Sequence, residues 1–332
     1  MNGSPNMSSR PNPILSAPRW LQIGIVVMAL LAVAPPIIAA LDQAFWLDVF
    51  TRMLILAIAA ASLNLILGFG GMVSFGHAAF LGIGAYCVGI PAYYDVYGGF
   101  LHIGFAVFFS ALYALITGAI SLRTKGVHFI MITMAFGQMM FFGFVSLEEY
   151  GGDDGLIIYE RSNFNGLIDL YDDTTFYYVC LISLAVVLFI INRLVNSRFG
   201  MVVKGAKSNE RRMGALGHPT YRYRLTAYVV SGAICGYAGA LLGNFTEFIS
   251  PEMMDWTRSG ELIFMVVLGG TATIFGPVYG VLAFLVIEEV LSSITTYWHL
   301  IFGLLLVLVV LFVRGGIAGL LRGWFSRKKG AV

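Results

Sequence analysis

Long runs of apolar residues set the strongest constraint on how this chain folds. The first run extends from Trp20 to Leu41 without a charged residue, and about 20 apolar residues are enough for a helix to cross a bilayer. A soluble domain has too little interior for so many apolar side chains, since 58% of the residues are hydrophobic and only 11% are charged. We therefore predict an integral membrane protein. Further runs follow at residues 47–67, 79–94, 100–122, 127–147, 176–193, 225–245, 260–272, 276–294 and 298–314.

Helices are the expected form of these runs. Backbone groups in lipid must be satisfied within their own segment, and the sequence lacks the alternating pattern of a membrane β-barrel. We predict an all-α, polytopic bundle of about ten transmembrane helices, with roughly eight to eleven compatible because several runs are short. The transmembrane domain is expected at residues 20–321, between a disordered tail at 1–19 and a basic tail at 322–332.

The charges of two loops predict the orientation. Residues 194–224 contain seven basic side chains and one acidic side chain, whereas residues 146–175 contain eight acidic side chains and one basic side chain. Basic loops are retained in the cytoplasm. We therefore expect residues 194–224 inside the cell, the acidic loop outside, and both chain termini in the cytoplasm. The net charge of +2 is too small to suggest a nucleic-acid partner.

Glycines interrupt the apolar pattern between Leu67 and Tyr86. Two interpretations are open. Small residues allow neighbouring helices to pack closely, whereas a broken helix would expose backbone groups to a transported solute. A second interruption, at Val267–Gly280, strengthens the interpretation as a broken helix, because corresponding breaks in two halves of a transporter indicate a central pathway. At a constant offset of 200 residues, Gly70, Phe75 and Gly76 correspond to Gly270, Phe275 and Gly276.

Ionisable residues inside apolar runs need an explanation, because each costs roughly 2.5 to 3.5 kcal/mol in lipid. For Glu288 and Glu289, a polar contact inside the bundle and a role in moving solute or protons are both open. His77 either packs with a local hydrogen bond or meets a carboxylate solute. No catalytic motif and no Cys and His cluster at metal-ligand spacing occurs, so we expect a non-catalytic chain without its own cofactor or metal.

Several stretches together resemble the branched-chain amino acid ABC transporter permease family, specifically its LivM-type subunit. They follow one another at the spacing of the family between residues 47 and 322. The stretches are SLNLILGFGGMVSFGHAAFLGIGAY (Ser62–Tyr86), ITMAFGQMM (Ile132–Met140), GGDDGL (Gly151–Leu156), the basic loop and the helix after it (Asn196–Leu241), LIFMVVLGGTATIFGPVYG (Leu262–Gly280) and the C-terminal segment (Phe302–Leu321).

The resemblance implies the partners of an ABC importer in the bacterial inner membrane. These are a LivH-like second permease subunit, two cytoplasmic ATPases that bind the ATP, and an extracytoplasmic solute-binding protein. The basic loop resembles the segment that docks on the ATPases. Where family members usually have small residues, this chain has two arginines, which either match a more acidic groove or are ordinary cytoplasmic charge. The implied coupling residues are Asn209, Glu210, Arg211, Arg212, Gly214 and Gly217.

Transport by alternating access is also implied, with the ATPases driving the rearrangement and helix N-termini holding a substrate carboxylate. The acidic loop either contacts the solute-binding protein or is simply solvated. Branched-chain amino acids are the expected substrates, while urea, amides and small aromatic acids are alternatives within the family. A stand-alone secondary transporter or channel is the rival interpretation, although it gives the basic loop no role. The expected pathway residues are Gly70, Gly71, Ser74, Phe75, Gly76, His77, Gly269, Gly270, Thr271 and Gly276.

Overall fold

A computed structural model describes residues 19–40, 44–164, 169–312 and 315–319. The expected N-terminal tail, apart from Arg19, and the expected C-terminal tail at 322–332 lie outside the described residues. The same holds for residues 165–168 of the acidic loop.

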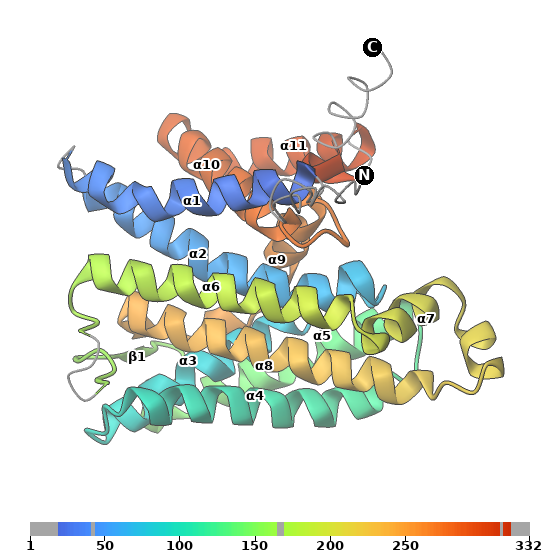
Figure 1. Ribbon diagram of the computed structural model, residues 1–332. Helices are drawn as coiled ribbons and strands as arrows, with labels where there is room; N and C mark the ends of the chain where they lie inside the picture. Colours follow the sequence, from blue (N-terminus) through green and yellow to red (C-terminus); the bar gives the residue numbers. More distant parts are fainter. Residues whose placement is uncertain (1–18, 41–43, 165–168, 313–314, 320–332) are drawn as a thin grey trace, which may run out of the picture.

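Each predicted apolar run contains a helix (Figure 1). Six helical segments of the described residues are long and apolar enough to cross a membrane, namely 45–69, 99–121, 127–145, 173–195, 220–246 and 276–294. The polytopic, mostly helical fold is thus confirmed, while the number of about ten crossings stays a prediction. The helices are α1 (Arg19–Ala40), α2 (Ala44–Asn64), α3 (His77–Tyr93), α4 (Gly99–Ser121), α5 (Val127–Val145), α6 (Asp173–Val195), α8 (Thr220–Thr246), α9 (Trp256–Gly269), α10 (Gly276–Ile294) and α11 (Trp298–Phe312).

Helix α8 forms the centre of one half of the bundle, where it packs against α3 and α4. The contact between α3 and α8 is close because small residues face one another. A methyl group on Gly84 would collide with the backbone carbonyl of Gly236, and one on Gly239 with the carbonyl of Leu81. The later glycines of Leu67–Tyr86 therefore serve helix packing, as one of the two interpretations predicts.

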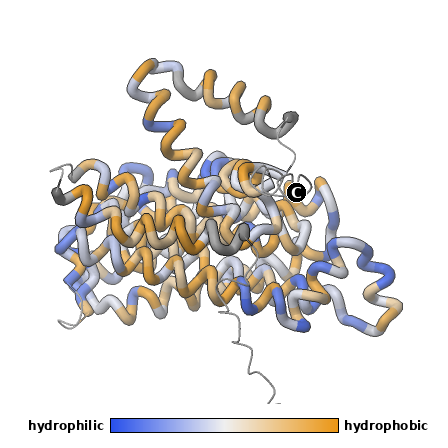
Figure 2. Tube along the Cα trace, turned by 45° about the horizontal axis from the view of Figure 1, so that its top comes forward, coloured by the Kyte–Doolittle hydropathy of each residue, from blue (hydrophilic) through white to orange (hydrophobic). Residues whose placement is uncertain are grey.

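Large apolar side chains cover the outer faces of several helices. Phe100 and Phe108 of α4, Met131 of α5 and Phe189 of α6 are each at least 60% exposed. In Figure 2 hydrophobic residues extend along the helices, while hydrophilic residues concentrate at the two ends of the bundle. This distribution suits a bundle surrounded by lipid at its middle and by water at its ends.

A short antiparallel sheet closes the end of the bundle that carries the acidic loop. Strand β1 (Leu156–Ile157) pairs with β2 (Phe248–Ile249), and short 3₁₀ turns occupy η2 (Glu148–Tyr150) and η3 (Pro251–Met254). Arg161 connects this loop to the start of α6 and the end of α8, with contacts of 2.9 Å to Asp173 and 2.7 Å to Glu247, the residue after α8. The otherwise all-α fold therefore includes one small ordered β element.

The expected loop at 194–224 is largely helical. It contains α7 (Arg198–Ala215), and α8 already begins at Thr220. The segment looked like a loop because it is polar, and helix formation there depends on caps rather than on an apolar run. Ser197 caps the start of α7 by accepting a hydrogen bond from the backbone N–H of Gly200.

Candidate translocation and coupling site

The first glycine break separates α2 from α3. Helix α2 continues into a single π-helical turn, η1 (Leu65–Phe69), after which the backbone is not helical until His77. Gly71 adopts a positive φ of 69°, a conformation that favours glycine. The structure thus contains the interrupted helix that the second interpretation predicts, confined to the early part of the glycine-rich segment.

The second break separates α9 from α10. Helix α9 ends at Gly269, and Gly270 has a φ of 113°. The Thr273 hydroxyl donates a hydrogen bond of 2.8 Å to the Gly270 carbonyl and closes the turn before α10 begins at Gly276. Each break therefore contains a glycine with a positive φ between an incoming and an outgoing helix.

Asn64 joins the two breaks directly. Its side-chain amide donates to the Thr273 carbonyl at 2.8 Å and accepts from the Ala272 N–H at 3.1 Å. The side chain is only 1% exposed. A methyl group on Gly68 would collide with both Asn64 and the Ala272 backbone, so glycine at this position permits the close approach. The two breaks consequently lie side by side at one end of the bundle.

Protein groups close the N-terminus of α3. The Ala78 N–H donates to Ser259 at 2.9 Å, and the Phe75 N–H donates to Thr133 at 3.3 Å. His77 is fully buried, with Nε2 at 2.8 Å from the hydroxyl of Ser231. The geometry supports the interpretation of His77 as a packed residue with a local hydrogen bond.

The ten expected pathway residues differ in accessibility. Only Gly71 and Thr271 are exposed, Phe75 is half-buried, and the other seven are buried, namely Gly70, Ser74, Gly76, His77, Gly269, Gly270 and Gly276. Their role in the pathway therefore stays a prediction.

Helix α7 consists of two helical parts joined at Asn209, whose φ of −158° and ψ of 99° are extended. Asn209 caps the second part by accepting from the Arg212 N–H at 2.9 Å. Met213 of the second part packs against Gly205 of the first. The kink therefore separates a part that faces the bundle from a part that points away from it.

Glu210 holds the kink against two neighbouring segments. Its carboxylate lies 2.6 Å from Lys125 in the α4–α5 connection and 3.3 Å from Arg224 of α8. Partial burial on its own raises the pKa of this carboxyl, but the hydrogen bond from Lys125 and the charge of Arg224 outweigh it and lower the pKa from its ordinary value. Glu210 is therefore charged at neutral pH and positions α7.

The second part of α7 presents an exposed surface. Arg211, Arg212 and Leu216 are exposed, and Leu216 has 68% of its surface accessible. A methyl group on Gly214 or Gly217 would meet no atom within 4 Å, so packing within the described residues does not require glycine at Gly214. Together these residues form a small basic and apolar face that is open to a soluble partner.

The first part of α7 contacts the first break. The Lys207 ammonium donates a hydrogen bond of 2.6 Å to the carbonyl of Gly68, and its stem covers Gly71. The ammonium of Lys204 lies 5.5 Å from the ring centre of Phe69. Reasoning from the sequence missed Lys207, because its charge was only counted with the other basic residues of the loop.

Ion pairs involve three of the ionisable residues in the apolar runs, Arg52, Glu261 and Glu288. Glu288 of α10 lies 3.8 Å from Arg52 of α2, so a polar contact inside the bundle is present. Arg258 of α9 contacts Glu261 at 3.1 Å. Within the described ranges, no three His, Cys, Asp or Glu side chains gather to form a metal site.

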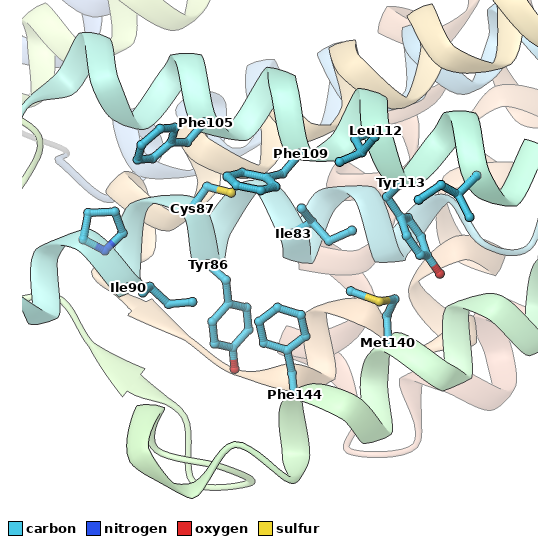
Figure 3. A pocket seen from close by; sticks show the side chains of 12 residues that line it. Ile83, Tyr86, Cys87, Ile90, Phe105, Phe109, Leu112, Tyr113, Met140 and Phe144 are labelled. Atoms are coloured by element: carbon cyan, nitrogen blue, oxygen red, sulfur yellow. The ribbon is translucent and has the colours of Figure 1, made fainter.

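An apolar cavity of about 490 Å³ lies between α3, α4 and α5 (Figure 3). The Tyr86 and Phe144 rings lie side by side in it, with centroids 4.3 Å apart. No charged side chain lines the cavity. It therefore suits a lipid chain or another apolar group better than a charged solute.

Comparison with known proteins places these features in a family. Residues 45–311 match the family described as the permease component of branched-chain amino acid transport systems. The chain is 28% identical over 331 residues to the high-affinity branched-chain amino acid transport system permease protein LivM of Escherichia coli. This match covers 93% of this chain and 77% of that protein. It is 27% identical over 288 residues to the LivH permease protein of Salmonella typhimurium, covering 79% and 91% respectively. No solved structure matches the chain.

Proposed function

The chain belongs to the family of branched-chain amino acid transport permeases, as a permease subunit of an ABC transporter, and we propose that it imports branched-chain amino acids into the cytoplasm. In this proposal the chain spans the bacterial inner membrane with both termini in the cytoplasm. It pairs with a LivH-like permease, and two ATPases supply the energy. The similarity to both LivM and LivH proteins supports this arrangement, because the two names denote separate permeases.

The contact between Lys207 and Gly68 is the observation that best supports an ATP-driven mechanism. Lys207 is two residues before the kink at Asn209, and the exposed face of α7 begins directly after the kink. A movement of that face is therefore transmitted over a short distance to the first break. Asn64 then connects the first break to the second. We propose that ATPase closure pulls on this chain of contacts and opens the two breaks in alternating access.

The acidic loop is the proposed contact for the solute-binding protein. Asp153 and Asp154 are exposed, as is Tyr159, which has 86% of its surface accessible. Their loop is held in place by the β1–β2 pair and by Arg161. An ordered acidic surface at the end of the bundle opposite α7 supports the proposal, since charge complementarity steers protein association.

Uptake by a reconstituted transporter tests the function. Proteoliposomes with this chain, its partner permease and the ATPases should accumulate labelled leucine, isoleucine and valine only when ATP is inside the vesicle and the binding protein outside it. Proteoliposomes without the ATPases serve as the control. Accumulation driven by an ion gradient without ATPases would overturn the proposal, and so would uptake of urea or an aromatic acid but of no branched-chain amino acid.

A further inference from the structure

A pocket of mixed charge lies at the end of the bundle opposite α7. It has a volume of about 310 Å³, at the lower end of the range for ligand sites, which suits one small solute. Helices α2, α8, α9 and α10 supply most of its walls. The residues that line this charged pocket are Arg52, Leu56, Leu81, Leu242, Thr246, Met253, Arg258, Glu261, Leu262, Met265, Phe284 and Glu288.

The charged residues of the pocket are inside helices rather than in loops. Arg52 is seven residues from the start of the span 45–69, and Glu288 is six residues from the end of the span 276–294. At 1.5 Å per residue, both lie roughly 10 Å from the helix ends. Their side chains keep 45% and 21% of their surface exposed. Exposed charges at this depth are costly in lipid, which favours a pocket that holds water or a polar ligand.

The ion pairs of the pocket differ in strength. Arg258 approaches both oxygens of Glu261, at 3.1 and 3.4 Å, so its charge is well satisfied. Arg52 instead lies 3.8 Å from Glu288, which is beyond hydrogen-bond distance. The Arg52 guanidinium and the Glu288 carboxylate are thus the pair that a ligand separates most easily.

Apart from Thr246, the rest of the pocket is apolar. Leu81, Leu262 and Phe284 are buried beneath the charged rim. A ligand that fits carries one positive group, one negative group and a short aliphatic part. The cavity of Figure 3 offers the apolar part but no charged group.

We propose that the charged pocket binds the zwitterionic main-chain group of an amino acid, with the aliphatic side chain on the apolar floor. Arg52 pairs with the carboxylate, and Glu288 pairs with the ammonium group. This inference rests on the proposed function, because it takes an amino acid as the imported solute. It places a binding site away from the two glycine breaks, so that the solute waits in the outer half of the permease until the breaks open.

Neutralising the pair tests the proposal. In the complete transporter, Arg52→Gln combined with Glu288→Gln removes both charges without leaving one buried alone. Binding of tritiated leucine to the transporter in nanodiscs, without the binding protein, should weaken at least about tenfold, the effect of losing about 1.4 kcal/mol. Glu289→Gln is the matched control, because Glu289 is the next residue of α10 and does not line the pocket. Wild-type affinity in the double variant would overturn the proposal.

Competition with the unaltered transporter gives a test that does not depend on a variant folding. 4-Methylpentanoate lacks the ammonium group of leucine, and 3-methylbutylamine lacks its carboxylate. At a tenfold excess over leucine, neither should displace the tritiated leucine, whereas isoleucine and valine should. Displacement by either analogue, or no displaceable leucine binding at all, would overturn the site. If the transporter imports leucine but the charged pocket fails these tests, the proposed function stands and only the binding site is wrong. If the transporter imports no amino acid, the proposed function and the binding site are both wrong.

Discussion

The side-chain amide of Asn64 donates a hydrogen bond of 2.8 Å to the carbonyl of Thr273, across 209 residues of sequence. The same amide accepts from the Ala272 N–H. One buried side chain beside the first break thus replaces helical hydrogen bonds that the second break gives up, and it connects the two halves of the chain at the point where each is interrupted.

Removing this connection should loosen the end of the bundle. Asn64→Ala leaves the Ala272 N–H and the Thr273 carbonyl without their partner, and an unsatisfied buried group costs about 1–3 kcal/mol. We expect a lower unfolding temperature in detergent, measured by intrinsic fluorescence. Asn196→Ala, at the exposed end of α6, is the control and should change the unfolding temperature little. Equal unfolding temperatures for Asn64→Ala and wild type would contradict a connecting role.

The hydrogen bond from Lys207 to the Gly68 carbonyl should decide how efficiently ATP is used. Lys207→Met keeps an aliphatic stem against Gly71 but cannot donate the hydrogen bond. Since residues that carry coupling typically contribute about 0.5–2 kcal/mol, the ATP consumed per leucine imported should rise about 2- to 30-fold. The measurement compares phosphate release and leucine uptake in the same proteoliposomes.

Arg198→Met is the control for Lys207, because Arg198 is an exposed cation of the same helix that lies nine residues before Lys207, at the start of α7. It should leave the ratio of ATP to leucine unchanged. An unchanged ratio in Lys207→Met as well would show that α7 communicates with the bundle by another route.

Most of the fold was predictable, because transfer into lipid dominates the energetics of apolar segments. Every apolar run became a helix, since lipid leaves the backbone no other partner. Helix α7, of 18 residues, was not predicted, because its buried apolar face is limited to a few residues such as Val202, Val203 and Ala206 within a polar segment. The π-helical turn after Asn64 was not predicted either, since the sequence of Leu65–Phe69 is typical of an ordinary α-helix.

Only those features of the site that depend on neighbouring residues in the sequence were predictable. The spacing of the glycines predicted the positions of both breaks. It did not predict that Asn64 connects them, although a single amide in an apolar run needs polar partners. Its partners are 208 and 209 residues away, and only the folded chain brings them near. The charges of Arg52 and Glu288 were visible in sequence, whereas their pairing depends on how α2 packs on α10.

Glu210 should make the stability of the protein depend on pH in a specific direction. Its pKa is lower in the folded protein than its ordinary value of 4.5. The stability that its charge contributes is therefore present above pH 4.5 and is lost as the pH falls through the folded pKa. Unfolding temperatures of wild type and Glu210→Gln should differ at pH 7 and converge as the pH falls below the folded pKa. A difference that grows on acidification would contradict the role of Lys125 and Arg224 as its partners.

Labelling of single cysteines from one side of the membrane tests the orientation on which the coupling role of α7 depends. Cys180 and Cys235 are buried and Cys87 is half-buried, so a variant with alanine at all three is the background. In intact cells, a membrane-impermeant maleimide should label Asp153→Cys but not Arg212→Cys, and permeabilised cells should show label on both. Leu304→Cys, exposed on apolar α11, should resist the hydrophilic reagent in either condition. Label on Arg212→Cys in intact cells would place α7 outside, where no cytoplasmic ATPase can reach it.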